Sequence, residues 1–274
     1  MKEYPAIDVR TDAADLLLAI VDEFGPTAVE ERDASVRIFF SSSADRDNAQ
    51  RAVQGRYDVA SIDVPDEDWA RRSQENLTPI TVGRIIVAPP WSAIDHPPLA
   101  ISDQPSAIRI VILPSMGFGT GHHATTRLCL SALQTLDLTG RTVLDVGTGS
   151  GVLAIAADRL GAAGAVGIDF DEDAVASARE NLTLNPDAKH VVFEVADVAG
   201  AALPAADVVT ANLTGALLVK SADALLGAAQ PGGTLILSGI QSEEHDAVRR
   251  SFAGSNVIWE REEDGWVGLA VKKP

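Results

Sequence analysis

Three alternate glycines, Gly147, Gly149 and Gly151, follow a short apolar run in the middle of the chain. The run before them, 142–146, has the composition of a buried strand, and the residues after them, 152–160, are good helix formers. Glycine adopts positive φ at little cost and lets a ligand approach the backbone closely. The amino terminus of the helix would point into the same loop. The segment therefore predicts either a loop wrapped around a ligand or a structural strand-to-helix turn.

A second short strand, 165–169, ends in Asp169, about twenty residues after the first glycine. A nucleoside-binding α/β fold places there the carboxylate that binds the ribose hydroxyls. Loop, helix, strand and acid in this order favour the ligand-binding interpretation. The pattern D-x-G-x-G-x-G differs from the dinucleotide fingerprint G-x-G-x-x-G, so a nicotinamide-dependent dehydrogenase fits poorly.

Two adjacent histidines, His122 and His123, follow a run of glycine and threonine. No carboxylate or cysteine lies nearby at the spacing of a metal site, so we expect no bound metal. No Gly-Lys-Ser/Thr follows the glycines, which argues against a phosphate-binding Walker loop. We expect this segment to cap a helix at 125–136 and to direct backbone and hydroxyl donors towards a cleft.

Composition restricts the class of protein and its partners. The 274 residues carry a formal net charge of −17, which disfavours a nucleic acid held by its phosphates and suits a basic protein partner. Acidity can equally serve solubility alone.

The sequence shows neither a signal-peptide pattern nor a run long enough to span a membrane, and we expect a cytoplasmic protein. The single cysteine, Cys129, is expected to be a buried core thiol.

The chain is expected to contain two domains joined by a linker. Residues 1–63 show a β-α-β-β-α-β order that is typical of a ferredoxin-like α+β domain. Residues 64–78 are polar and predict a linker helix. Residues 79–274 form the larger domain. Its remaining elements are expected as strands at 191–195, 207–211 and 234–238, helices at 173–182, 222–229 and 243–252, and further strands at 257–260 and 266–271.

The segment F-G-T-G-H-H-A-T-T at 118–126, the glycine loop and A-N-L at 211–213 together resemble the ribosomal protein L11 methyltransferase (PrmA) family. The glycine loop alone is similar to the first motif of all class I S-adenosylmethionine-dependent methyltransferases. The likeness continues through Trp69 in the acidic linker and the turn at 89–91. The sequence departs from the family pattern at Ala124, where proline is common, and at Thr214.

The resemblance implies an α/β, Rossmann-like methyltransferase domain whose seven-stranded mixed sheet closes with an antiparallel hairpin at 257–271. It implies S-adenosyl-L-methionine as the cofactor and Thr126, Gly147, Asp169 and Asn212 as its contacts. Phe118, Gly149 and Asp197 complete the set of expected cofactor-binding residues. Asp197 follows the third strand, where such folds often contact the adenine amino group, although an exposed turn aspartate is an equal alternative. Asn212 ends the fourth strand at the edge where α/β ligands bind; capping of the helix expected from Gly215 is its less favoured role.

The resemblance also implies transfer of methyl groups to lysine ε-amino groups and the N-terminal α-amino group of a large-subunit ribosomal protein. The small N-terminal domain would select that basic partner, since residues 1–78 hold 9 Lys/Arg against 17 Asp/Glu. No general base is identifiable, so Asn212, as the catalytic residue, would orient the amine while solvent takes its proton. We expect a monomer that binds neither nucleic acid nor a membrane.

Two other functions remain open from the sequence. A methyltransferase of the same lineage could act on another protein's lysine or on a small molecule. A non-catalytic module could bind the cofactor or a partner without turnover, although that would predict broken motifs around the cleft, and these are intact.

Overall fold

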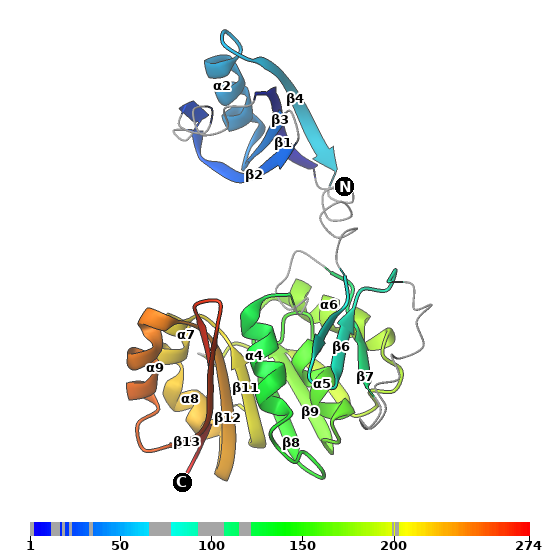
Figure 1. Ribbon diagram of the computed structural model, residues 1–274, viewed down its shortest axis with the longest axis vertical. Helices are drawn as coiled ribbons and strands as arrows, with labels where there is room; N and C mark the ends of the chain where they lie inside the picture. The colour runs from blue at the N-terminus through cyan, green and yellow to red at the C-terminus, as the bar shows by residue number, and fades with distance from the viewer. Residues whose placement is uncertain are drawn as a thin grey trace. The chain divides into compact units, whose positions relative to one another are not determined.

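Figure 1 shows the computed structural model, which describes residues 3–11, 17, 20–21, 24–32, 35–65, 78–92, 107–114, 122–198, 200 and 203–274. The chain divides into two compact units, Met1–Asn76 and Leu77–Pro274, and each is described by itself. Among the described residues, no helix is both long enough and apolar enough to cross a membrane. Most of the predicted linker helix lies outside the described residues.

The N-terminal unit contains a four-stranded antiparallel sheet and a helix packed on it. The strands have the spatial order β2 (Pro26–Arg32), β3 (Ser35–Phe40), β1 (Glu3–Arg10), β4 (Asp58–Pro65). Helix α2 (Ser43–Val53) begins at Ser42, whose hydroxyl accepts from the backbone N–H of Asp45, and buries Ala49 and Val53 against the sheet. The first helix of the predicted β-α-β-β-α-β order falls largely outside the described residues. The described elements agree with the ferredoxin-like order.

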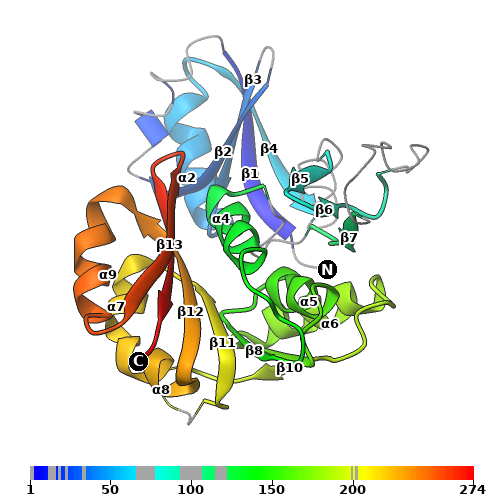
Figure 2. The ribbon, with the colours of Figure 1, turned by 60° about the horizontal axis from the view of Figure 1, so that its bottom comes forward.

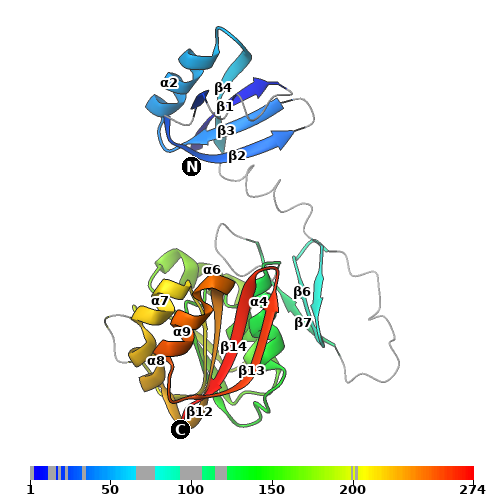
Figure 3. The same ribbon diagram turned by 60° about the vertical axis from the view of Figure 1, so that its left-hand side comes forward.

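The second unit is organised around a seven-stranded mixed sheet, as the family resemblance implied. Its spatial order is β10 (Val191–Val195), β9 (Gly164–Asp169), β8 (Thr142–Val146), β11 (Ala206–Asn212), β12 (Ala229–Gln241), β14 (Trp266–Lys272), β13 (Asn256–Glu263). The first five strands are parallel, and β14 is antiparallel to both of its neighbours. The predicted closing hairpin, β13–β14, is therefore confirmed (Figure 3). The carboxyl ends of the parallel strands all lie at one edge of the sheet.

Helices cover both faces of this sheet (Figure 2). One face carries α4 (Ala124–Leu133), α5 (Val152–Arg159) and α6 (Glu172–Thr183), and Cys129 is buried there as predicted. The other carries α7 (Gly215–Lys220), α8 (Ala222–Ala228) and α9 (His245–Ser251), the last preceded by a 3₁₀ turn, η2 (Ser242–Glu244). Strand residues alternate between the two cores because successive side chains point to opposite faces.

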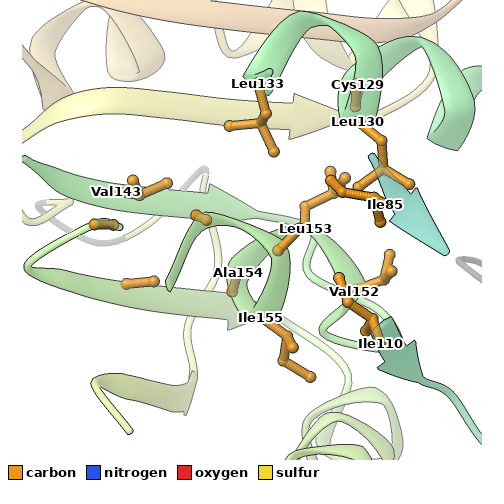
Figure 4. Packing of buried hydrophobic residues seen from close by; sticks show 14 of the residues in the cluster. Ile85, Ile110, Cys129, Leu130, Leu133, Val143, Val152, Leu153, Ala154 and Ile155 are labelled. Atoms are coloured by element: carbon orange, nitrogen blue, oxygen red, sulfur yellow. The ribbon is translucent and has the colours of Figure 1, made fainter. Parts of the chain in front are cut away.

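A small sheet lies beside α5. It consists of β5 (Ile80–Val82), β6 (Ile85–Ala88) and β7 (Ile108–Val111), with β6 and β7 parallel. Figure 4 shows Val152 and Leu153 of α5 in one apolar cluster with Ile85 and Ile110 of this sheet. The small sheet is thus fixed to the helix that follows the glycine loop.

The fifth parallel strand is longer than the sequence predicted. A strand was expected at 234–238, whereas β12 runs from Ala229 to Gln241. The pairing of β11 with β12 passes from Ala206–Ala229 directly to Val208–Thr234, and Gly232 has φ 72°. Residues 230–233 therefore form an irregularity inside the strand, because glycine absorbs the extra length at positive φ.

Candidate functional site

The glycine loop between β8 and α5 has the conformation that its sequence predicted. Gly147, Gly149 and Gly151 have φ values of 70°, 52° and 82°. The backbone N–H groups of Gly147 and Thr148 both donate to the carbonyl of Ile168 in β9 at 2.9 Å, so the loop turns tightly over the neighbouring strand. Gly151 is the N-cap of α5, whose amino terminus opens into the loop.

Close packing, in addition to φ, requires two of these glycines. A Cβ on Gly151 would lie 2.6 Å from Cζ of Phe193, and a Cβ on Gly147 would overlap the Leu213 side chain. Phe193 in β10 and Leu213 after β11 thus contact the loop from two different strands. The loop is therefore held at a fixed place at the carboxyl edge of the sheet.

Asp169 ends β9 beside this loop and is almost fully buried. Its Oδ2 accepts from the backbone N–H of Gly149 at 3.0 Å, and its Oδ1 accepts from that of Asp171 at 3.2 Å. A carboxylate has about four acceptor positions, so these two bonds leave room for hydroxyl donors. Asp171 in turn caps α6 by accepting from the N–H of Asp173.

A second acid, Asp145, lies beneath the loop with a side chain fully buried in β8. The hydroxyls of Thr148 and Thr210 donate to its two carboxylate oxygens, each at 2.6 Å. Burial raises its pKa to about 6 because the charged form loses its hydration, and the two hydroxyl bonds oppose that shift. Asp145 therefore ties the loop to β11 and is not available to a ligand.

Asn212 and Thr126, predicted from distant parts of the sequence, lie together. The Asn212 amide Nδ2 is 3.5 Å from Oγ1 of Thr126, which is fully buried in the first turn of α4. Capping of the following helix was the alternative role for Asn212, and it is wrong. The N-cap of α7 is Thr214, whose hydroxyl accepts from the N–H of Leu217.

These elements enclose a cavity of about 580 Å³ at the carboxyl edge of the sheet. Five predicted site residues line it: Gly147, Gly149, Asp169, Asp197 and Asn212. Thr126 does not line the cavity itself. Its hydroxyl contacts the side chain of Asn212, which does. Phe118, the remaining predicted residue, lies outside the described residues. Clusters of His, Cys, Asp or Glu that could hold a metal are absent from the described part of the chain.

The cavity contains residues that the sequence did not indicate. Phe170, directly after Asp169, is 76% exposed, which is unusual for a large apolar side chain. Leu217 and Lys220 line the cavity from one face of α7. Phe170 has a local signal, because an apolar residue after a strand-ending acid falls at the binding edge. The lining positions on α7 depend on how that short helix packs, which no local pattern encodes.

Trp266 reaches the cavity from the far end of the chain and meets His123. Their ring centroids are 4.9 Å apart in an edge-to-face arrangement. His123 is the N-cap of α4, with Nδ1 accepting from the N–H of Thr125, which confirms the predicted helix cap. The two residues are 143 positions apart in the sequence, so no local motif predicts this contact.

Arg127 of α4 holds the tip of the β13–β14 hairpin, which carries Trp266. Its Nε donates to Glu263 at 2.5 Å and its Nη2 to Asp264 at 2.9 Å. Asp264 and Gly265 have φ values of 52° and 76°, as a two-residue type I′ hairpin turn requires. Arg127 thereby links the helix that His123 caps to the hairpin that supplies Trp266.

Comparisons with known proteins agree with this geometry. The family model for ribosomal protein L11 methyltransferase (PrmA) matches residues 11–274. A ribosomal protein L11 methyltransferase of Pelobacter propionicus is 34% identical and aligns over 97% of this chain and 96% of its own length. Another, from Pseudomonas aeruginosa strain PAO1, is 38% identical over 217 residues, covering 77% of this chain and 69% of that protein.

Solved structures agree with the fold. The crystal structure of a ribosomal protein L11 methylase from Lactobacillus delbrueckii subsp. bulgaricus has a TM-score of 0.65 at 26% identity, covering 72% of this chain and 100% of that one. The match to the family model extends over both compact units, and the resemblance carried by the glycine loop is thereby confirmed. The chain belongs to the ribosomal protein L11 methyltransferase (PrmA) family of methyltransferases.

Proposed function

We propose that this protein transfers methyl groups from S-adenosyl-L-methionine to ribosomal protein L11, at lysine ε-amino groups and the N-terminal α-amino group. The observation that carries the proposal is the convergence of Gly149, Asp169 and Asn212 on one cavity in a member of this family. The relatives' names supply the protein substrate, and the cavity supports the donor.

The cavity fits a nucleoside without phosphates. Its volume lies within the range of small-molecule sites, about 300–1,000 Å³. Its charged lining consists of three acids, Asp169, Asp171 and Asp197, and one lysine, Lys220. This acidic lining would repel a pyrophosphate and suits a ligand that bears a positive sulfonium. Oxygen acceptors on Asp169 suit ribose hydroxyls, and the exposed ring of Phe170 suits the face of a base.

When bound, the cofactor supplies a methyl group activated by its sulfonium. The residues of this chain would position the cofactor and the substrate amine relative to each other. Asp169 would bind the ribose hydroxyls while it keeps Gly149 in place, and Asp197 would accept from the base. Asn212 directs its amide nitrogen towards Thr126, so its Oδ1 remains as an acceptor for an N–H of the substrate amine.

The amine must be neutral to attack, and no residue of the site is assigned as its base. We propose that solvent takes the proton and that Asn212, with backbone carbonyls, aligns the nitrogen lone pair with the methyl group. Asp145 is excluded as the base because it is buried beneath the loop with both oxygens bonded to hydroxyls.

We propose that the N-terminal unit selects the protein substrate and that the protein acts as a cytoplasmic monomer. The net charge of −17 supports a basic protein partner over a nucleic acid. The glycine loop, Asp169 and Asn212 all belong to the other unit, which leaves the N-terminal unit for recognition.

Incubation with tritiated S-adenosylmethionine and purified large-subunit ribosomal proteins tests this function. The proteins would then be separated, and the labelled one mapped by mass spectrometry. Label on lysines and the N-terminus of L11 is the expected result. Label on a different protein would keep the chemistry and replace the substrate. Binding of the cofactor without transfer to any ribosomal protein would reject the proposed substrate class.

A further inference from the structure

Two buried asparagines lie at the carboxyl-terminal end of α6. Asn181 is fully buried, and Asn185, one turn further on, is 4% exposed. The Asn185 amide nitrogen donates to the carbonyl of Asn181 at 2.7 Å. Buried amides of this kind are costly unless their donors and acceptors are bonded, so their partners indicate what they stabilise.

Both side chains bind the backbone of β7 and the residues after it. β7 pairs with β6 along one edge only, which leaves backbone groups on the other edge. Asn185 pairs with both backbone groups of Val111, accepting from its N–H at 2.8 Å and donating to its carbonyl at 2.7 Å. Asn181 accepts from the N–H of Leu113 at 2.7 Å. The two amides therefore act in place of a neighbouring strand.

Asn181 differs from Asn185 by one further bond. Its Nδ2 donates to the carbonyl of Ser150 at 2.9 Å, and Ser150 lies between Gly149 and Gly151 in the glycine loop. The Asn185 side chain bonds to Val111 and to the Asn181 carbonyl, and within the described part of the chain it makes no bond to the glycine loop. One amide thus joins the end of the small sheet to the loop that faces the cavity.

We propose that Asn181 is a positioning residue that sets the conformation of the glycine loop for cofactor binding, an inference that rests on the proposed function. Gly151 caps α5 without a side-chain bond, and the glycines have no side chains with which to anchor themselves. The Asn181 amide fixes the peptide between Ser150 and Gly151 by its bond to the Ser150 carbonyl. It thereby orients the Gly149 N–H, which donates to Asp169 on the cavity side.

The substitution Asn181→Asp isolates this bond. An aspartate keeps the oxygen that accepts from Leu113. When protonated it can also donate an O–H to the Ser150 carbonyl, and when ionised it offers only acceptors and repels that carbonyl. Burial raises the pKa of such a carboxyl well above its usual range, so the neutral form is available in mildly acidic buffer. Asn185→Asp is the matched control, because it perturbs the segment directly after α6 and the same strand without touching the loop.

The experiment measures the dissociation constant of S-adenosylhomocysteine for the full-length wild type and both variants at pH 6 and pH 8.5. Since a buried acceptor would lose its donor, Asn181→Asp should bind on the order of tenfold more weakly than wild type at pH 8.5. It should recover most of this loss at pH 6. Asn185→Asp should match wild type at both pH values, even though its unfolding midpoint falls. Equal affinities for the two variants at pH 8.5 would overturn the proposal.

Hydrogen exchange without the cofactor provides a second readout. Amides of residues 147–151 should exchange faster in Asn181→Asp at pH 8.5 than in Asn185→Asp, each relative to wild type at the same pH. Equal loop protection in the two variants would also overturn the positioning role. A wild type that binds no cofactor would reject the proposed function instead, and the exchange comparison would still decide the role of Asn181.

Discussion

At the scale of single residues, Asp145 shows how the site uses buried charge. The folded state raises its pKa from 3.8 to about 6, so the folded protein binds a proton more tightly than the unfolded chain does. Its contribution to stability therefore falls as the pH rises from about 4 to about 6, and the loss is complete above that range. The predicted size is about 3 kcal/mol, at 1.36 kcal/mol for each pKa unit.

Urea unfolding of wild type and Asp145→Asn between pH 4.5 and pH 7.5 measures this effect. Other titrating groups cancel in the difference between the two proteins. The free energy of unfolding of wild type relative to the variant should decrease as the pH rises through this window. A difference that stays constant with pH would show that Asp145 does not titrate as described.

Asn212 carries the proposed alignment of the amine. Asn212→Ala should lower kcat by about a hundredfold, because the acceptor that orients the amine is lost. Thr142→Ala is the control, since it removes the hydroxyl bond from Thr142 to Asp207 at the end of β8 opposite the cavity and should cost about 1 kcal/mol of stability with turnover retained. Steady-state kinetics and thermal unfolding of both variants check the prediction. Normal turnover and cofactor affinity in Asn212→Ala would remove this residue from the mechanism.

At the scale of elements, the turn after β11 depends on β12. Gly239 has φ 83°, and a Cβ there would overlap the backbone carbonyl of Leu213, whose N–H donates to Ser238 at 3.0 Å. Gly239→Ala should therefore destabilise the protein by about 3 kcal/mol or more, through strain and through displacement of this backbone. Gly232→Ala has a similar φ of 72° with open space around the new methyl, so it reports the conformational cost alone.

Denaturant unfolding of the two variants gives the comparison. Gly239→Ala should lose clearly more stability than Gly232→Ala, and its turnover should fall because Asn212 precedes Leu213. Equal losses would mean that close packing at Gly239 contributes nothing beyond its backbone conformation.

The sequence predicted those elements that have local signals. The glycine loop, the strand that ends in Asp169 and the hairpin at 257–271 follow from periodicity, turn residues and the family resemblance. Asn212 and Thr126 were also predicted, because each belongs to a motif. The contact of Trp266 with His123 and the bond from Asn181 to Ser150 depend on tertiary packing between distant segments. Such contacts have no local spacing from which they could be inferred.

At the scale of the whole molecule, charge should govern the encounter with the substrate. A net charge of −17 attracts a basic protein over long distances, and salt screens this attraction. Raising the ionic strength from about 50 mM to about 300 mM should lower kcat/KM for L11 on the order of tenfold. The cofactor dissociation constant, set inside the cavity, should change little. A kcat/KM that is independent of salt would contradict electrostatic recognition of the partner.

We expect the cavity bounded by the glycine loop and Asp169 to bind the cofactor. Titration calorimetry of wild type and Asp169→Ala with S-adenosylmethionine tests it most directly. Asp207→Ala is the control, because Asp207 binds the backbone N–H and hydroxyl of Thr142, the first residue of β8, at the opposite end of that strand from the loop. Wild type and Asp207→Ala should bind one cofactor per chain with equal affinity. Asp169→Ala should bind about a hundredfold more weakly, since it loses charge-assisted bonds to the ribose and to Gly149. An unchanged affinity in Asp169→Ala would contradict this site and place the cofactor elsewhere.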